Sequence, residues 1–280
     1  VLGGLIGSET GRTVHTARSF LGIHRVNKDS DNVHLWLVHG VTVHGGRSLL
    51  PDEKNEPMAY YHRRGPAGQF MTDFVPRHPK AKASVIGLGA GSLIAYTGTE
   101  WDWTFYELDP LVQKIAEDGR WFTFLKNAAA PYRVVLGDAR LSMSRADSSE
   151  MYDLIVLDAF GSDAIPVHLL TREALRLYLS RLKKGGVIAA HITSRTVRLY
   201  GVLARLADDA GLAALEQDDA SGNADLAAGK FSSEWVVMAR SVDDLGALIS
   251  DKRWFPVRAD KNASVWTDDF SNVLEVVDWE

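Results

Sequence analysis

Short apolar runs and amphipathic segments alternate along the chain after Lys82. Helical periodicity is clearest at 110–119 and 171–186, and a helix start is expected at 91–98. Because strands and helices alternate, this pattern predicts an α/β fold with a parallel sheet covered by helices on both faces. The runs expected to form its buried strands are 83–89, 103–109, 132–139, 152–160 and 187–194.

The following segments complete the predicted sheet. A further helix is expected at 197–211, and the runs 212–219 and 232–241 resemble a closing antiparallel pair. The sheet would then have seven strands, most of them parallel. The tail at 264–277 has no partner that the pattern identifies.

The N-terminal part has a different pattern. From Ser19 to His44, two or three short strands are separated by the polar turn NKDSDN, which predicts a small antiparallel module. A connection rich in proline and glycine follows, with a helix expected near Gly68 to Phe74. We therefore expect a leader or linker at 1–18, a β module with its connecting segment at 19–78, and a catalytic α/β domain at 79–280.

Composition narrows the functional classes. The 280 residues carry a formal net charge of -5 without a basic block, so we expect no nucleic-acid partner. The absence of cysteine excludes disulfides, thiolate zinc sites and cysteine nucleophiles. The histidines, among them His24, His39 and His44, lack the grouping of metal ligands, so we expect no metal. No run approaches the roughly 18 apolar residues of a transmembrane helix.

A glycine-rich loop follows the first strand of the predicted sheet. The spacing G-x-G-x-G at Gly87, Gly89 and Gly91 places Ser92 where a dinucleotide fingerprint has its third glycine. No Gly-Lys-Ser/Thr follows, so the loop is not a triphosphate loop either. What remains is either a purely structural tight turn or a turn whose backbone approaches a ligand closely.

Acidic residues follow the next three strands. In an open parallel sheet these strand ends meet at the edge where ligands bind. Glu107 can accept both ribose hydroxyls, and Asp138 beside the Ala139 amide can accept from the exocyclic amine of adenine. Each alone would equally suit a helix cap. Together with Asp158 they repel a pyrophosphate and favour a cationic nucleoside without phosphates, such as S-adenosylmethionine.

Six segments resemble, in order and spacing, the spermidine synthase (polyamine aminopropyltransferase) family. They are HGVTVHG, EPMAYYHRRGPAGQ, VIGLGAGSL, YELDP, LDAFGSDAIPVHLLTREAL and VWTDDFSNVL. The resemblance implies a methyltransferase-like Rossmann fold after a small β module, and a homodimer. It is nearest to bacterial synthase-like domains fused behind a membrane region. This agrees with a chain that starts at valine, and implies a cytoplasmic location, free or attached to the inner membrane.

The resemblance also implies roles for single residues. Asp158 matches the catalytic aspartate that orients an attacking amine and favours its loss of a proton, and Tyr61 belongs to a pair that closes over the transferred group. The donor would be S-adenosylmethionine or its decarboxylated form, the acceptor a small amine and the by-product methylthioadenosine. The residues expected to bind the nucleoside are Gly87, Gly89, Ala90, Gly91, Glu107, Leu108, Asp138, Ala139 and His62.

Three further residues are expected to bind the acceptor. Asp163 is an approximate counterpart of the family's second acid, and His191 ends the fifth strand. Asp268 lies in the VWTDDFSNVL segment, which would form a lid with Trp266 and Asp269. A structural role for His191 and an ordinary acidic turn at Asp268 stay open.

Ala90 departs from the family pattern. An aspartate stands there in the family and holds the ammonium group of the decarboxylated donor, so its loss would allow intact S-adenosylmethionine to bind. The predicted activity is transfer of an aminopropyl-type group. Three alternatives remain: S-adenosylmethionine-dependent methyl transfer, a lyase or cyclisation reaction on S-adenosylmethionine, and a non-catalytic nucleoside sensor of a membrane protein.

Overall fold

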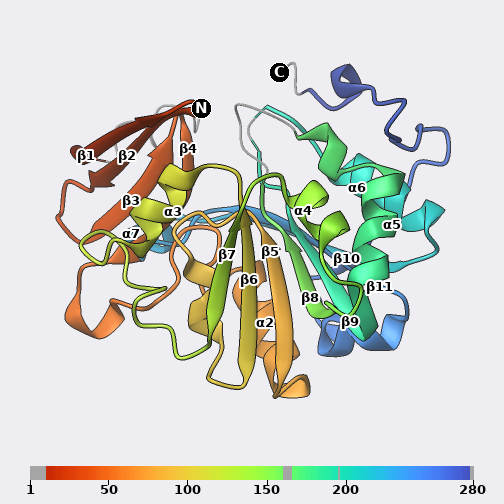
Figure 1. Cartoon of the computed structure of the whole chain (residues 1–280), viewed down its shortest axis with the longest axis horizontal. Helices are drawn as coiled ribbons and strands as arrows, with labels where there is room; N and C mark the ends of the chain where they lie inside the picture. Colours follow the sequence, from red (N-terminus) through yellow and green to blue (C-terminus); the bar gives the residue numbers. More distant parts are fainter. Residues whose placement is uncertain (1–10, 160–165, 195, 278–280) are drawn as a thin grey trace.

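A four-stranded antiparallel module stands beside a larger α/β domain in the computed structural model, which describes residues 11–159, 166–194 and 196–277 (Figure 1). The strands of this β module are neighbours in space in their sequence order. They are β1 (Arg12–Ser19), β2 (Gly22–Lys28), β3 (His34–His39) and β4 (Thr42–Ser48).

Strand β1 lies in a segment expected to be a leader or linker. Its sequence RTVHTARS is largely polar and has no fully buried residue, so a hydrophobic pattern does not reveal it. The strand pairs with β2 from Arg12 to Ser19, and the ring of His15 stacks on Trp121 with the centroids 5.2 Å apart. The β module therefore starts earlier than Ser19, the boundary expected from the sequence.

The large sheet has the strand order β12-β10-β11-β9-β8-β5-β6-β7. Strands β5 to β9 are parallel to one another, and β11 and β10 close the sheet as the predicted antiparallel pair. A two-residue strand, β12, adds an eighth member at the edge and is too short to leave a pattern in the sequence. The strands are β5 (Ala81–Ile86), β6 (Trp101–Glu107), β7 (Tyr132–Leu136), β8 (Tyr152–Leu157), β9 (Leu182–His191), β10 (Ala213–Asp219), β11 (Ser233–Ala239) and β12 (Phe255–Pro256).

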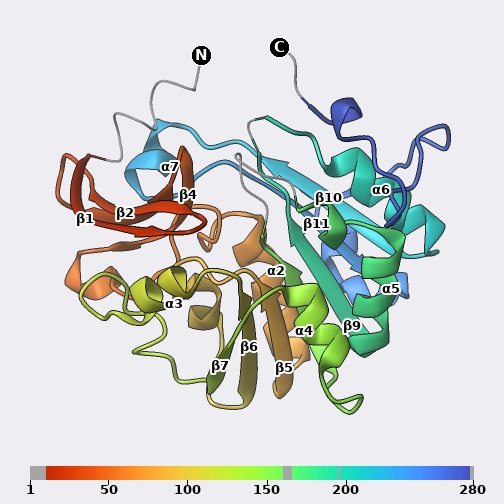
Figure 2. The ribbon, with the colours of Figure 1, turned by 45° about the horizontal axis from the view of Figure 1, so that its top comes forward.

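Helices cover both faces of this sheet (Figure 2). The α-helices are α2 (Pro66–Arg77), α3 (Pro110–Glu117), α4 (Ala139–Arg145), α5 (Arg172–Arg181), α6 (Tyr200–Asp209) and α7 (Asn223–Ala227). The 3₁₀ helices are η2 (Pro51–Glu53), η3 (Ser92–Tyr96), η4 (Val167–Leu169), η5 (Val242–Ser250) and η6 (Val273–Glu275). No helix among the described residues is long and apolar enough to cross a lipid bilayer.

Alternate residues of the central strands belong to two separate cores. Leu154 and Val156 of β8 pack into the core that contains α2 and α3, whereas Ile155 and Leu157 pack with α4, α5 and α6. All four are at most 2% exposed, and each such side chain stabilises the fold by about 1.5–3 kcal/mol. Because both faces are buried, the strands are mostly apolar toward their carboxyl halves. Charged residues such as Lys82, Asp102 and Asp153 lie near the amino ends, and Glu107, Asp138 and Asp158 lie at or just after the carboxyl ends.

Candidate active site

A cavity of about 320 Å³ is lined by the β module and by the carboxyl ends of β5, β6, β7, β8 and β9. Its volume lies at the lower end of the range usual for small-molecule sites. The predicted site residues that line it are Tyr61, Gly87, Gly89, Glu107, Leu108, Asp138, Ala139, Asp158 and His191.

The loops after β5 and β8 touch at this cavity. The Asp158 amide donates to the carbonyl oxygen of Ile86 over 2.8 Å. Gly87 has a φ of +106°, and a Cβ atom there would collide with the carbonyl oxygen of Asp158. The first glycine of the loop is therefore needed for a backbone contact that places Asp158.

Asp158 is held from two sides. The hydroxyl of Tyr61 donates to Oδ2 over 2.7 Å, and Nδ1 of His191 lies 2.8 Å from Oδ1. All three side chains are less than a tenth exposed. Burial, with the charge of Asp158 as a further cause, raises the pKa of Tyr61 well above its ordinary value, so the tyrosine stays a neutral donor.

The surroundings of His191 fix its tautomer. Nδ1 faces the Asp158 carboxylate, which only accepts when it is ionised, so we assign the ring proton to Nδ1. The Thr193 hydroxyl, whose oxygen lies 2.8 Å from Nε2 and accepts the Glu234 amide over 2.8 Å, is then assigned as the donor to Nε2. Nδ1 therefore donates to Asp158. A carboxylate has about four acceptor positions, so Asp158 retains acceptor capacity beyond these two contacts.

Glu107 ends β6 and is tied to the glycine loop. Its carboxylate accepts the Leu88 amide over 3.0 Å and the Asp109 amide over 2.8 Å. Burial raises the pKa of Glu107 against the opposing effect of these amides. The two amides orient the carboxylate in the cavity wall and leave part of its acceptor capacity for a ligand.

Asp138 precedes α4 and caps it. Oδ1 accepts the Leu141 amide over 2.8 Å, and Nε2 of His168 lies 2.8 Å from Oδ2. Although burial opposes ionisation, the contacts with Leu141 and His168 hold the pKa of Asp138 below its ordinary value. Ala139 is the first residue of α4, where helix amides have no partner within the helix. An ionised acceptor and an amide donor therefore lie side by side.

Residues from the β module line the cavity without having been predicted as site residues. Nε2 of His24 lies 2.9 Å from Asp109, the cap of α3, and the His24 ring stacks on His39 with the centroids 4.5 Å apart. His44 lies next to His39 at 6.0 Å. Within the described part of the chain, no three acidic or histidine side chains form a metal-binding group. The sequence contains no signal for this convergence, because it depends on how the module docks.

Four predicted residues lie elsewhere. Ala90 is 1% exposed and packs against β4, and Gly91 packs against Leu125, so neither lines the cavity. The Nδ1 atom of His62 accepts the Arg64 amide outside it. Asp268 is paired with Arg140 of α4 and does not line the cavity. Asp163 lies outside the described residues.

Known proteins resemble this chain in sequence and in fold. A polyamine aminopropyltransferase from Vibrio vulnificus is 41% identical over 120 residues, which make up 41% of this chain and 38% of that relative. A probable spermidine synthase from Corynebacterium glutamicum aligns over 93% of this chain and 98% of its own, with a TM-score of 0.64 and 16% identity. The spermidine synthase from Thermotoga maritima aligns over 92% and 82%, with a TM-score of 0.57 and 13% identity.

The structural matches confirm the Rossmann-like α/β fold, and together with the sequence match they confirm the resemblance to spermidine synthases. No family model matches the chain. The chain spans well under half the length of the curated relative that it matches.

Proposed function

We propose that the protein transfers an aminopropyl-type group from a sulfonium nucleoside to a small amine and releases methylthioadenosine. The placement of Asp158 is the observation that carries this proposal. Its carboxylate is buried, oriented by Tyr61 and His191, and set in the cavity that also contains Glu107 and Asp138. The sequence match to a polyamine aminopropyltransferase supports the same reaction class.

Glu107 and Asp138 suit the two ends of a nucleoside. Glu107 follows β6 and offers carboxylate oxygens to the ribose hydroxyls. Asp138 and the Ala139 amide follow β7 and match the exocyclic amine and the ring nitrogen of adenine. Their carboxylates, together with that of Asp158, favour a positively charged sulfonium nucleoside over a phosphorylated one.

The proposed chemistry is a single displacement. The amine lone pair forms a bond to the carbon next to sulfur, the carbon–sulfur bond breaks, and its electron pair neutralises the sulfonium. Asp158 orients the amine and accepts the proton that the nitrogen loses. Because the leaving group is neutral methylthioadenosine, holding the amine in line with the breaking bond is the larger part of catalysis.

Ala90 bears on which donor is used. Position 90 is an alanine, so it offers no carboxylate to a donor ammonium group. We propose that the site accepts intact S-adenosylmethionine as well as its decarboxylated form. The same feature supports the second candidate function, a reaction of intact S-adenosylmethionine such as methyl transfer, elimination or cyclisation. A cytoplasmic location, a homodimer and an attached membrane region remain proposals that rest on the motif resemblance.

Product identity tests the proposal. The protein is mixed with decarboxylated or intact S-adenosylmethionine and a panel of di- and polyamines, and the products are identified by mass spectrometry. We expect methylthioadenosine together with an alkylated amine. S-adenosylhomocysteine would instead identify a methyltransferase, and methylthioadenosine without an alkylated amine would identify elimination or cyclisation. Binding of the donors without any product would favour a sensor.

A further inference from the structure

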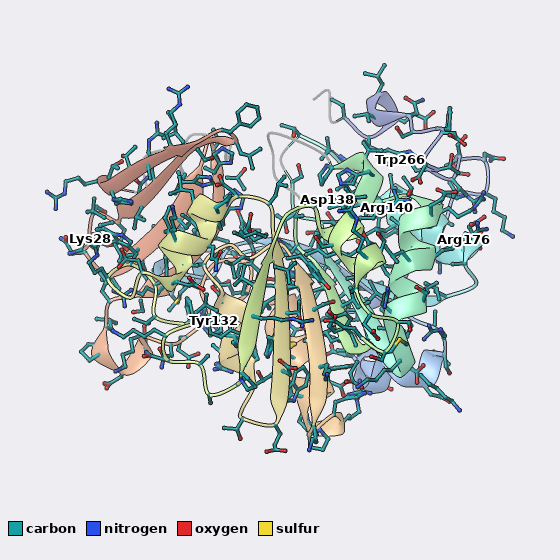
Figure 3. All side chains as sticks on the ribbon, viewed as in Figure 1. Lys28, Tyr132, Asp138, Arg140, Arg176 and Trp266 are labelled. Carbon is teal, nitrogen blue, oxygen red and sulfur yellow. The ribbon has the colours of Figure 1, made fainter. Side chains whose placement is uncertain are left out.

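The base end of the cavity is tied to the C-terminal segment through a chain of polar contacts. Arg140, the second residue of α4, directs its guanidinium group at Asp268, with Nη1 2.7 Å from Oδ1 and Nη2 2.6 Å from Oδ2. These residues are 128 positions apart in sequence. Figure 3 shows Asp138 and Arg140 at the start of α4, on the side of the molecule where Trp266 of the C-terminal segment lies.

The guanidinium group of Arg140 also contacts His168, whose ring lies beside Asp138. Nη1 of Arg140 donates to the carbonyl oxygen of His168 over 2.9 Å. The ring of His168 then lies 2.8 Å from Oδ2 of Asp138. His168 lines the cavity, whereas Arg140 and Asp268 do not. Asp138, His168, Arg140 and Asp268 therefore form a connected network, which we call the base-end latch.

The C-terminal side of the latch is itself anchored. The Thr171 hydroxyl, which caps α5, donates to Oδ1 of Asp268 over 2.8 Å, and the Asp268 amide donates to Glu173 over 3.0 Å. Trp266 is 3% exposed, and its carbonyl oxygen accepts the Arg172 amide over 2.9 Å. Because Asp268 is anchored by Thr171 and Glu173, its pairing with Arg140 restricts the position from which Arg140 donates to the carbonyl oxygen of His168. A bidentate arginine–carboxylate pair is suited to such a task because its planar geometry fixes orientation as well as distance.

We propose that His168, Arg140 and Asp268 are positioning residues for base recognition, acting through Asp138. The inference rests on the proposed nucleoside site. By donating to Oδ2, His168 keeps Asp138 an ionised acceptor in one orientation. Asp138 then accepts from a base with an exocyclic amine and disfavours a base that presents a keto oxygen there, because two acceptors cannot share a proton that neither carries. Asp268 thus serves the base end of the site, although the sequence placed it at the acceptor end.

The test compares binding of 5′-methylthioadenosine with that of 5′-methylthioinosine, which has a keto oxygen in place of the amine. Titration calorimetry of the wild-type protein, His168→Ala and Asp268→Ala gives the ratio of the two dissociation constants. We expect the wild-type preference for the adenine nucleoside to fall about tenfold in each variant, since each loses an oriented contact to a charged group. With the proposed donor, the loss should fall on KM rather than on kcat.

Matched variants separate positioning from general destabilisation. Arg172 and Asp209 form a second bidentate pair, with contacts of 2.7 and 2.6 Å between α5 and α6, and neither lines the cavity. Asp209→Ala should therefore leave the base preference unchanged. His168→Gln should restore much of the preference, because the glutamine amide can donate to Asp138. Asp268→Asn provides a milder change if Asp268→Ala does not fold.

The outcomes distinguish a failure of the base-end latch from a failure of the proposed nucleoside site. An unchanged preference in His168→Ala or in both Asp268 variants, in a protein that binds methylthioadenosine, overturns the latch and leaves the proposed function standing. An equal loss of preference in Asp209→Ala also overturns it. If the wild-type protein binds neither nucleoside, the nucleoside site and the latch fail together.

Discussion

The hydroxyl of Tyr61 lies 2.7 Å from Oδ2 of Asp158, across 97 positions of sequence. Tyr61 comes from the segment that connects the β module to α2, and Asp158 directly follows β8. Their contact links the two parts of the molecule at the cavity. It gives Asp158 a neutral donor, because the pKa of Tyr61 is raised by burial and by the aspartate.

Tyr61→Phe should reduce kcat about tenfold. The change retains the ring and removes one hydrogen bond to a charged group, a contact of about 1.5–3 kcal/mol. Since the pKa of Tyr61 lies well above its ordinary value, the alkaline side of the pH–rate profile should keep its shape. Steady-state kinetics across pH measure both effects. Tyr132→Phe, at the opposite end of the sheet from the cavity (Figure 3), is the control. An alkaline limb lost in Tyr61→Phe would show that Tyr61 ionises during turnover.

Gly45→Ala should destabilise the protein by about 2–3 kcal/mol and weaken nucleoside binding. Gly45 has a φ of +118°, and an added Cβ would lie 2.9 Å from Cβ of Ala90. The neighbouring His44 carbonyl oxygen accepts the Ala90 amide over 3.0 Å, so a shift of β4 would move the glycine loop. Urea unfolding and calorimetry measure the two effects.

The matched control for Gly45→Ala is Gly98→Ala, because a Cβ at Gly98 meets nothing within 4 Å. It should be close to neutral in stability and in binding. Equal effects of the two substitutions would contradict the importance of the contact between β4 and the glycine loop.

Glu234→Gln should raise the free energy of unfolding above neutral pH. Burial, followed by the charges of Asp218 and Glu216, raises the pKa of Glu234 from 4.5 to about 7. Between pH 4.5 and about pH 7, the Glu234 carboxyl keeps a proton in the folded protein that it has lost in the unfolded chain. Stability therefore falls as pH rises through this window.

Glu234 is partly exposed, so solvent screens part of its charge. We therefore expect Glu234→Gln to raise the free energy of unfolding by about 1–2 kcal/mol at about pH 8. Near pH 4 the carboxyl is protonated in both states, and the variant should match the wild type. Urea unfolding at the two pH values measures the difference. An equal gain at both would show that the effect does not come from the charge.

The strand-end acids could be predicted from the sequence, because the local pattern of a parallel strand fixes where its carboxyl end lies. Glu107, Asp138 and Asp158 accordingly line one cavity. Ala90 could not be placed, because the spacing of glycines does not show which way the intervening side chain turns. Its contact with β4 depends on the docking of the β module.

Contacts between residues far apart in sequence explain the other site residues that the sequence misplaced or did not reveal. Asp268 was expected near the acceptor, but the sequence contains no indication that Arg140, 128 positions away, would bind it. The convergence of His24, His39 and His168 on the cavity likewise depends on tertiary packing. His168 had one local signal: it is a polar residue two positions after Pro166, in an otherwise apolar stretch that follows the strand before Asp158.

Asp158→Asn, measured for turnover and for nucleoside binding in the same preparation, tests the central claim most directly. Asp153→Asn on the same strand is the control, because Asp153 pairs with Lys183 away from the cavity. We predict that Asp158→Asn lowers kcat about 10³-fold while the dissociation constant of methylthioadenosine changes by less than about threefold. Wild-type turnover in Asp158→Asn, or a loss of nucleoside binding as large as the loss of turnover, would contradict the proposed role of Asp158, which is to orient the amine and accept its proton.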